Sequence, residues 1–217
     1  MKELLYDWGG ANAWLFYAIN RWHGDALDAV MRLGSFLGDH NRFPGYVAVL
    51  TLIALWRITR GDKPRRWLGV LAVFSVAYLL DGLLIDWVKH ALDFPRPLAA
   101  LAPDTVHIVG TPEYRESFPS GHAMFAVTCA ASLWPLLGRA GRGAAAAFVL
   151  WVAFSRISLG MHFPADVIAA GLLALAIVLS LRLALQKLMR RFNGITPRIR
   201  VARPARELSS RRRKRWS

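Results

Sequence analysis

The amino-acid sequence predicts an all-α membrane protein in which five or six transmembrane helices form a bundle. The first observation is hydropathy: 55% of the 217 residues are hydrophobic, and many of them gather in five long stretches. A helix needs roughly 20 mainly apolar residues to cross the hydrocarbon layer of a bilayer. A chain of this length cannot surround five such helices with a polar shell, so a soluble helical protein is excluded. The five predicted spans are residues 43–59, 67–88, 123–137, 144–159 and 163–181.

The first 40 residues predict a weaker association with the membrane. Residues 11–20 and 26–38 are each apolar but too short to cross, and Arg21, His23 and Asp25 interrupt them. We expect either a pair of interfacial helices or one broken span, which would be the sixth crossing. The predicted organisation has three parts: an N-terminal region 1–40, a membrane domain 41–190 and a tail 191–217.

The second observation is that basic residues concentrate in a few segments. The net charge is +14, and thirteen of the 28 Lys and Arg residues lie in residues 182–217, where Glu207 is the only acid. Because the rest of the chain is nearly neutral, a globally basic nucleic-acid-binding protein is excluded. We expect the tail 191–217 to be disordered and to contact anionic lipids. Cys129 is the only cysteine, which excludes a disulfide scaffold.

Loop charges also predict the orientation of the bundle, because loops rich in Lys and Arg stay in the cytoplasm. The loop 57–66 holds five basic residues, and the turn 138–143 holds two. If the five spans alternate, both segments lie on the same side as the basic tail. The loop 89–119 and the turn 160–163 then lie on the extracytoplasmic side, where we expect the active site. The predicted location is the inner (plasma) membrane of a bacterium, with the site facing the periplasm or the exterior.

Two clusters of polar residues mark span ends on that side. The first is KHALDFPRP, in which two prolines end the helix and place Lys89 and Arg96 on one surface. The second is FPSGHA, which leaves Ser120, the Gly121 amide and His122 at the start of a helix. Free N–H groups at a helix N-terminus attract anions. Together the two clusters predict an anion-binding surface.

A third cluster, SRISLGMHFPAD, lies at the turn between the last two spans. Arg156 precedes the turn, while His162 and Asp166 are four residues apart where the next helix begins. Residues four apart on a helix are neighbours, so the carboxylate can fix one imidazole nitrogen and leave the other as a nucleophile or base. Three permanent cations, a hydroxyl and two histidines on one face fit a phosphate group. No metal is required, since a Mg²⁺ site needs clustered carboxylates.

These three motifs, K-x6-R-P, P-S-G-H and S-R-x5-H-x3-D, resemble those of the type 2 phosphatidic acid phosphatase superfamily, whose active site is similar to that of vanadium haloperoxidases. The resemblance covers about residues 67–181. It implies that His162 attacks phosphorus to form a phosphohistidine and that Asp166 orients His162. It further implies that His122 protonates the leaving oxygen and then activates water. The phosphate-binding residues implied are Lys89, Arg96, Ser120, Gly121 and Arg156.

The resemblance implies a metal-independent phosphatase that needs no cofactor and acts on a phosphorylated membrane lipid. Undecaprenyl diphosphate is favoured; phosphatidic acid, phosphatidylglycerol phosphate and lipid A are the other candidates. A lipid phosphotransferase would use the same histidine chemistry. A non-catalytic lipid-phosphate carrier would need the cations but not an oriented His162. The sequence does not determine the oligomeric state.

Several polar residues also have structural interpretations. Lys and Arg at span ends often extend to the lipid headgroups as anchors. We expect Asp81 to be protonated or hydrogen-bonded to a neighbouring helix, with a place in a transport path as the alternative. We expect Asp86 to stabilise the end of its own helix, with tuning of Lys89 as the alternative. Arg115 and His107 are expected to be solvated loop residues.

Overall fold

The computed structural model describes residues 6–195, and this part of the chain is helical without any β-strand. Five helices make up the bundle: α3 (Phe43–Thr59), α4 (Pro64–Leu92), α6 (Gly121–Leu133), α7 (Arg139–Ser158) and α8 (Pro164–Ile195). Shorter elements are α1 (Ala11–Asn20), α2 (Asp25–Leu37), α5 (Pro97–Ala100) and the 3-10 turns Trp8–Gly10, His40–Arg42 and Pro103–Thr105. The predicted all-α class is confirmed. Most of the predicted tail lies outside the described residues.

Three segments of the described chain are long and apolar enough to cross a membrane: Pro64–Ala100, Arg139–Ser158 and Pro164–Arg191. Helix α6 has 13 residues and α3 has 17, so both are shorter than a typical span. The predicted third span, 123–137, ends early because the chain turns at Trp134, ahead of Pro135, whose missing amide cannot continue a helix. The count of five or six crossings therefore stays a prediction.

Apolar side chains cover the outside of the bundle. Leu83 and Trp87 on α4 and Leu172 on α8 are 65% to 70% exposed. A soluble protein rarely exposes apolar patches of this extent, whereas a lipid-facing surface requires them. The surface therefore supports an integral membrane protein.

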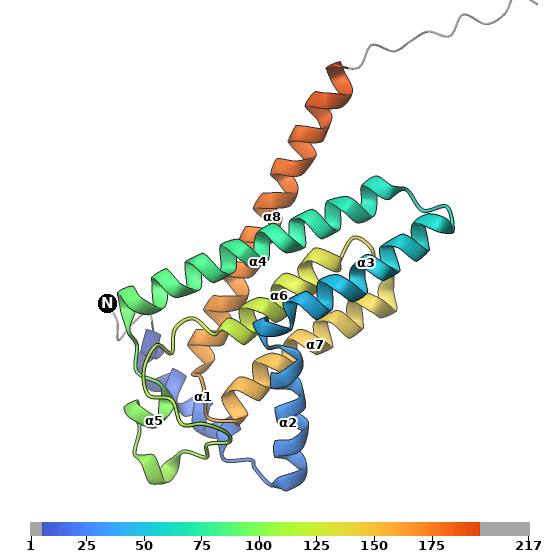
Figure 1. Ribbon diagram of the computed structural model, residues 1–217. Coiled ribbons are helices and arrows are strands. Elements are labelled where there is room, and N and C mark those ends of the chain that lie inside the picture. The colour runs from blue at the N-terminus through green and yellow to red at the C-terminus, as the bar shows by residue number, and fades with distance from the viewer. Residues whose placement is uncertain (1–5, 196–217) are drawn as a thin grey trace, which may run out of the picture.

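Helix α6 is the centre of the bundle and packs against α4, α7 and α8 (Figure 1). Small residues such as Ala123, Ala126 and Ala130 are buried along it and let the neighbouring helices approach closely. Larger side chains fill the spaces on either side: Phe125 packs with Phe74 of α4. Because α6 begins with the P-S-G-H motif, the packing places that motif among the ends of three other helices.

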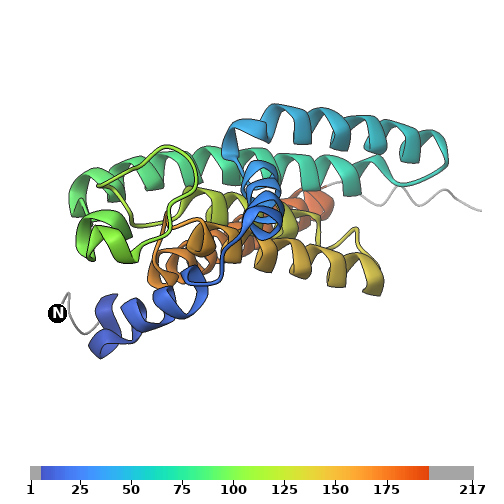
Figure 2. The same cartoon turned by 90° about the horizontal axis from the view of Figure 1, so that it is seen from below.

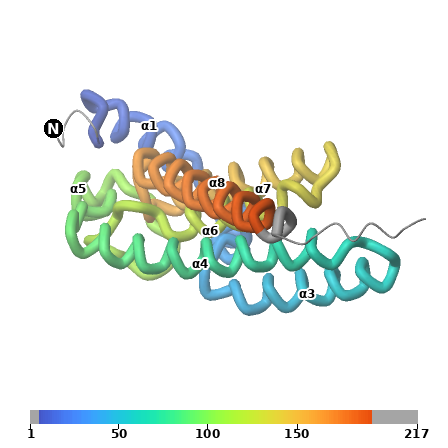
Figure 3. Tube along the Cα trace, turned by 90° about the horizontal axis from the view of Figure 1, so that it is seen from above, coloured from blue at the N-terminus to red at the C-terminus, as the bar shows by residue number. Residues whose placement is uncertain are grey.

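The two ends of the bundle differ. The α3–α4 and α6–α7 turns lie together at one end, and α1, α5 and the α7–α8 turn lie at the other (Figures 2 and 3). This arrangement is the alternation expected from the loop charges, because the basic segments 57–66 and 138–143 share one end. The three motifs gather at the opposite end.

The N-terminal region forms two separate helices, which fit both an interfacial pair and a broken span, so the choice between these two stays a prediction. Helix α1 has 10 residues and α2 has 13, and both pack against α7. Gly34 on α2 and Gly38 directly after it are one turn apart, and a Cβ at Gly34 would lie 2.8 Å from Trp151 Nε1 of α7. Because these glycines have no side chain, α2 packs close to α7. Ser35, which lies between them, therefore reaches the end of the bundle that holds the three motifs.

Candidate active site

A cavity of about 660 Å³ opens between α4, the start of α6 and the α7–α8 turn. Six of the eight predicted site residues line it, which are Lys89, Arg96, Gly121, His122, Arg156 and His162. The other two, Ser120 and Asp166, are fully buried next to them. The structure therefore brings all eight to one place, although they come from segments up to 77 positions apart in the sequence.

His162 and Asp166 are held together by the start of α8. Pro164 begins the helix, so His162 lies just before it and Asp166 lies in its first turn. His162 Nδ1 is 3.4 Å from Asp166 Oδ2, which is an ion-pair distance without the geometry of a hydrogen bond. Since Nδ1 faces the carboxylate, Nε2 is the nitrogen left for the cavity. Burial lowers the pKa of His162 to about 4, and Asp166 only partly offsets this effect, so the imidazole is neutral at neutral pH.

Three donors hold the Asp166 carboxylate. The Tyr6 hydroxyl donates to Oδ1 at 2.7 Å, while the Ser117 hydroxyl and the Phe163 amide donate to Oδ2 at 2.5 and 2.8 Å. Burial, followed by the negative charge of Asp166, raises the pKa of Tyr6 above its usual range, so the phenol stays a donor. The carboxylate is thus fixed in direction before any ligand binds.

Arg96 is held by backbone groups from both sides. Its Nε donates to the Arg115 carbonyl at 2.9 Å and its Nη1 to the Met161 carbonyl at 3.2 Å. Its Nη2 lies 2.5 Å from Glu113, a half-exposed acid that also lines the cavity. The guanidinium is 95% buried and links the loop after α5 to the α7–α8 turn. Among these partners of Arg96, Glu113 is the one that an anionic ligand would displace, and Asp86 and Glu116 are further acids in the wall of the same cavity.

The other two cations have fewer partners. Arg156 Nη1 donates to Ser35 of α2 at 2.6 Å, but its buried Nε has no hydrogen-bond partner. Lys89 makes no side-chain hydrogen bond or ion pair within the described residues, and it lies in the cavity wall. Both cations leave donors that an anion can use.

The start of α6 adds further donors. Ser120 is the N-cap of α6, and its buried hydroxyl has no partner. Gly121 and His122 follow in the first turn, where amides have no intrahelical acceptor. His122 lies beside His40, with ring centroids 6.4 Å apart. An anion with several acceptor oxygens is the ligand that such a set of donors fits best.

Sequence reasoning missed several residues that complete this site. Tyr6, Ser35 and Ser117 contact site residues directly, and the Asn12 side chain accepts from the Ala165 amide at 3.0 Å. None of these belongs to a motif. The sequence held one signal for such residues, because Asn12 and Asn20 are polar side chains within an apolar segment. In the structure both are almost fully buried and hydrogen-bonded.

Three further predictions concern Asp81, Arg115 and His107, and the structure agrees with the first two. Thr128 of α6 donates to Asp81 at 2.5 Å, as expected of an acid bonded to a neighbouring helix. Arg115 is solvated and paired with Asp93. His107 is different: its side chain is only 25% exposed and lies 3.0 Å from Asp28, since α2 packs beside the loop.

The fold is similar to that of two solved membrane phosphatases. LpxE of Aquifex aeolicus matches with a TM-score of 0.66 at 22% identity, over 79% of this chain and 94% of that one. A transmembrane PAP2-type phosphatidylglycerolphosphate phosphatase of Bacillus subtilis matches with a TM-score of 0.61 at 20% identity, over 90% of both chains. At these identities the likeness supports the fold alone.

Two curated relatives are similar in sequence. The lipid A 1-phosphatase of Rhizobium johnstonii is 33% identical over 110 residues, which are 48% of this chain and 42% of that protein. The undecaprenyl-diphosphatase BcrC of Bacillus subtilis is 28% identical over 187 residues, which are 82% of this chain and 84% of that protein. The chain thus spans less than half the length of the first relative and most of the second.

The profile of the PAP2 superfamily matches residues 68–190, which is more than half of the chain. The matched region contains all three motifs and every residue that lines the cavity except His40. On this match, together with the helical bundle, the chain belongs to the PAP2 superfamily.

Proposed function

We propose that this chain is a metal-independent lipid phosphatase that removes the terminal phosphate of a lipid phosphate or diphosphate through a phosphohistidine intermediate. One observation carries the proposal: a single cavity joins three cations and an oriented, neutral imidazole to an apolar wall. That wall includes Leu79 and Leu83 of α4 and Phe125 of α6. A lipid chain fits the apolar wall, while its phosphate fits the cations.

In the first step, Nε2 of His162 attacks phosphorus and the bond from phosphorus to the leaving oxygen breaks. Burial, followed by the charge of Arg156, lowers the pKa of His122 in the empty site far below its usual value, so His122 takes up its proton together with the anionic substrate. His122 donates that proton to the leaving oxygen, so the leaving group departs as a neutral alcohol or a protonated phosphate. The Nδ1–H of His162 faces Asp166, whose charge stabilises the cationic ring that forms.

In the second step, water attacks the phosphohistidine and gives one proton to His122. The phosphorus–nitrogen bond breaks, its electron pair returns to Nε2, and inorganic phosphate is released. Lys89, Arg96 and Arg156 stabilise the negative charge on the transferred group in both steps. The Ser120 hydroxyl and the Gly121 amide add uncharged donors.

For the substrate we propose undecaprenyl diphosphate. The relative with that activity aligns with most of this chain, whereas the lipid A phosphatase aligns with about half of it. Lipid A, phosphatidic acid and phosphatidylglycerol phosphate are the competing substrates. All four carry a phosphate at the membrane surface on an apolar body, which the cavity described above accommodates.

We propose that the protein lies in the inner membrane with the site facing the periplasm or the exterior. The basic segments 57–66 and 138–143 lie at the end of the bundle opposite to the site (Figure 2). Such segments stay in the cytoplasm, and the tail that follows α8 would meet anionic lipids there.

The test is phosphate release by the purified protein in detergent, with each candidate lipid supplied alone. We expect sustained release, and we expect His162→Ala to lower it by a factor of about 10⁴ or more because the nucleophile is lost. The matched control is His90→Ala, since His90 lies at the same end of α4 but outside the cavity and is 76% exposed. Full activity in His162→Ala would exclude the mechanism.

The same assay separates the related functions. A phosphotransferase would form the phosphohistidine but release little phosphate until a second lipid is added as acceptor. A carrier would bind the lipid phosphate equally well in the wild type and in His162→Ala and would release no phosphate from either.

A further inference from the structure

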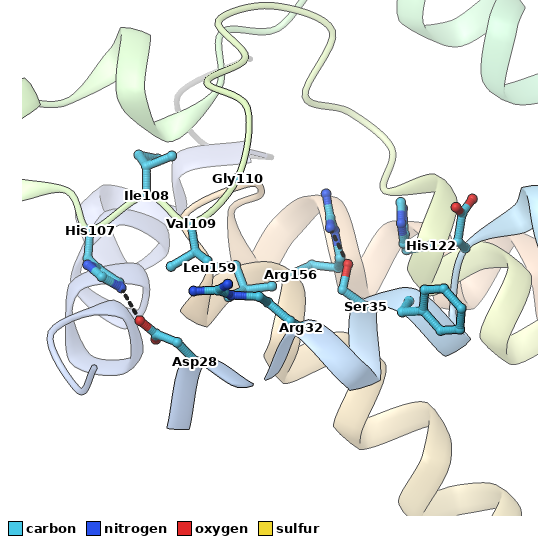
Figure 4. Close-up of a pocket in the computed structure, with 12 residues that line it drawn as sticks. Asp28, Arg32, Ser35, His107, Ile108, Val109, Gly110, His122, Arg156 and Leu159 are labelled. Atoms are coloured by element: carbon cyan, nitrogen blue, oxygen red, sulfur yellow. Dashed lines mark hydrogen bonds and ion pairs between the residues drawn. The ribbon is translucent and has the colours of Figure 1, made fainter. Parts of the chain in front are cut away.

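A second cavity, of about 520 Å³, lies between α2 and the loop 107–110 (Figure 4). It shares His122 and Arg156 with the first cavity, but its other lining residues are different. The two cavities therefore meet at these two side chains. A phosphate held by Arg156 is within reach of both.

The walls of the second cavity suit a small hydrated ligand. No membrane-facing stretch of α4 contributes to it, and Ser35, Asp39 and His107 line it together with the residues at the shared wall. Its apolar lining residues, Phe36, Ile108, Val109 and Leu159, come from α2, the loop 107–110 and the α7–α8 turn, and none comes from α4. A lipid chain is thus directed to the first cavity, and the second remains free while the lipid is bound.

The charged groups in this second cavity favour an anion. Both of its acids have a partner on one oxygen: Asp28 Oδ2 pairs with His107 at 3.0 Å, and Asp39 Oδ1 accepts from the Asn41 amide at 2.9 Å. The buried Oδ1 of Asp28 has no hydrogen-bond partner, so a ligand at that end must also supply a donor, as a water molecule or a hydrogen phosphate ion can. Both of its arginines keep free donors. Arg156 has an unpaired Nε, and Arg32 makes no hydrogen bond or ion pair within the described residues. In Figure 4, Arg32 lies in the cavity between Arg156 and the surface loop.

We infer that the second cavity is a separate aqueous route, through which water reaches the phosphohistidine and inorganic phosphate leaves. The inference rests on the proposed function, since it assigns a path to the water and the product of that reaction. His122 stands at the junction, where it protonates a leaving group in the first cavity and then deprotonates water arriving from the second. Arg32 attracts the phosphate ion outward after the phosphorus–nitrogen bond has broken.

The first experiment narrows the second cavity with Val109→Trp, because Val109 lines that cavity and does not line the first. With radiolabelled lipid phosphate, we expect a several-fold higher level of acid-quenched phosphohistidine and a slower release of phosphate. The matched control is Ala102→Trp, at an exposed position on the same loop outside the cavity. A phosphohistidine level equal to that of the wild type and the control would overturn the inference.

The second experiment removes the outer cation with Arg32→Ala. We expect the inhibition constant of inorganic phosphate to rise by roughly two- to fivefold, the range typical of an exposed charge, with an unchanged KM for the lipid. Arg60→Ala is the control, because Arg60 is an arginine at the opposite end of the bundle. A higher KM for the lipid with unchanged phosphate inhibition would instead make the cavity a headgroup site and would contradict the inference.

These outcomes are distinct from a failure of the proposed function. If the proposed function fails, the wild type forms no phosphohistidine and releases no phosphate. If only the aqueous route is wrong, the wild type is active and both cavity variants behave as it does.

Discussion

The active site has two halves, which differ in whether their polar groups have hydrogen-bond partners within the protein. Around Asp166, the protein supplies every partner: three donors surround the carboxylate, which is fully buried. Around Lys89 and Arg156, donors are left without acceptors. Buried polar groups are normally satisfied, so the unsatisfied half marks where a ligand binds, and the satisfied half marks what must already be in place when it binds.

The largest expected effect comes from breaking the satisfied half with Asp166→Asn. An amide can turn its NH₂ toward His162 and favour the wrong tautomer, so kcat should fall by about 10⁴. KM should change little, because the cations still bind the phosphate. Steady-state kinetics with the best lipid substrate measure both constants. A loss below tenfold would show that the direction of the imidazole does not depend on this carboxylate.

The next effect comes from the unsatisfied half, with Lys89→Gln. The ammonium has no partner within the described residues, so its loss should leave folding intact while lowering kcat/KM by about 10² to 10³. Inhibition by vanadate, a phosphate mimic, should weaken in parallel. Lys63→Gln at the opposite end of the bundle is the matched control. Equal losses of thermal stability and activity would point to a structural role for Lys89 instead.

A smaller effect is expected from Tyr6→Phe, which removes one of the three donors to Asp166. We expect kcat to fall by about tenfold with an unchanged KM. With fewer donors, the carboxylate interacts more strongly with His162 and raises the pKa of that imidazole, so the acidic limb of the pH profile moves to higher pH. Tyr17→Phe is the control, since the Tyr17 hydroxyl bonds only to Thr105, away from the site. If the acidic limb of the pH profile stays at the same pH, the Tyr6 hydroxyl does not influence the pKa of His162 and Tyr6 contributes packing alone.

The smallest effect is expected from mild acid on the wild type. Because burial lowers the pKa of His162 to about 4, the imidazole stays neutral down to that pH and loses activity only below it. Between pH 7 and pH 5, kcat/KM should therefore fall by only about a tenth from this group. A midpoint near pH 6.5, the ordinary value for histidine, in an NMR titration of the His162 imidazole itself would mean that His162 is far more hydrated than its burial indicates.

The sequence predicted the motif residues of the site better than the residues that hold them in place. Lys89, Arg96, His122 and Arg156 lie at helix ends that hydropathy and proline positions locate, and their spacing matches known motifs. Tyr6 lies 160 residues from Asp166, and Ser35 lies 121 residues from Arg156. No local spacing rule connects such pairs, because their contact depends on how α1 and α2 dock onto the bundle.

The fold, too, was predictable in some features and not in others. The helix class and the approximate ends of the helices followed from apolar stretches, while the early end of α6 depended on the turn before Pro135. The length of a crossing also depends on how helices tilt, which composition does not specify. For this reason the number of crossings stays a prediction even though the bundle is described.

The contact between Asn12 and the Ala165 amide has a practical consequence for shortened versions of the protein. A chain trimmed to the matched region 68–190 would retain every motif residue, and a profile would still identify it. It would lack the side chains that brace the first turn of α8 from outside. Such a shortened chain would still be recognised as a member of the family but would not hold its active site in the working geometry.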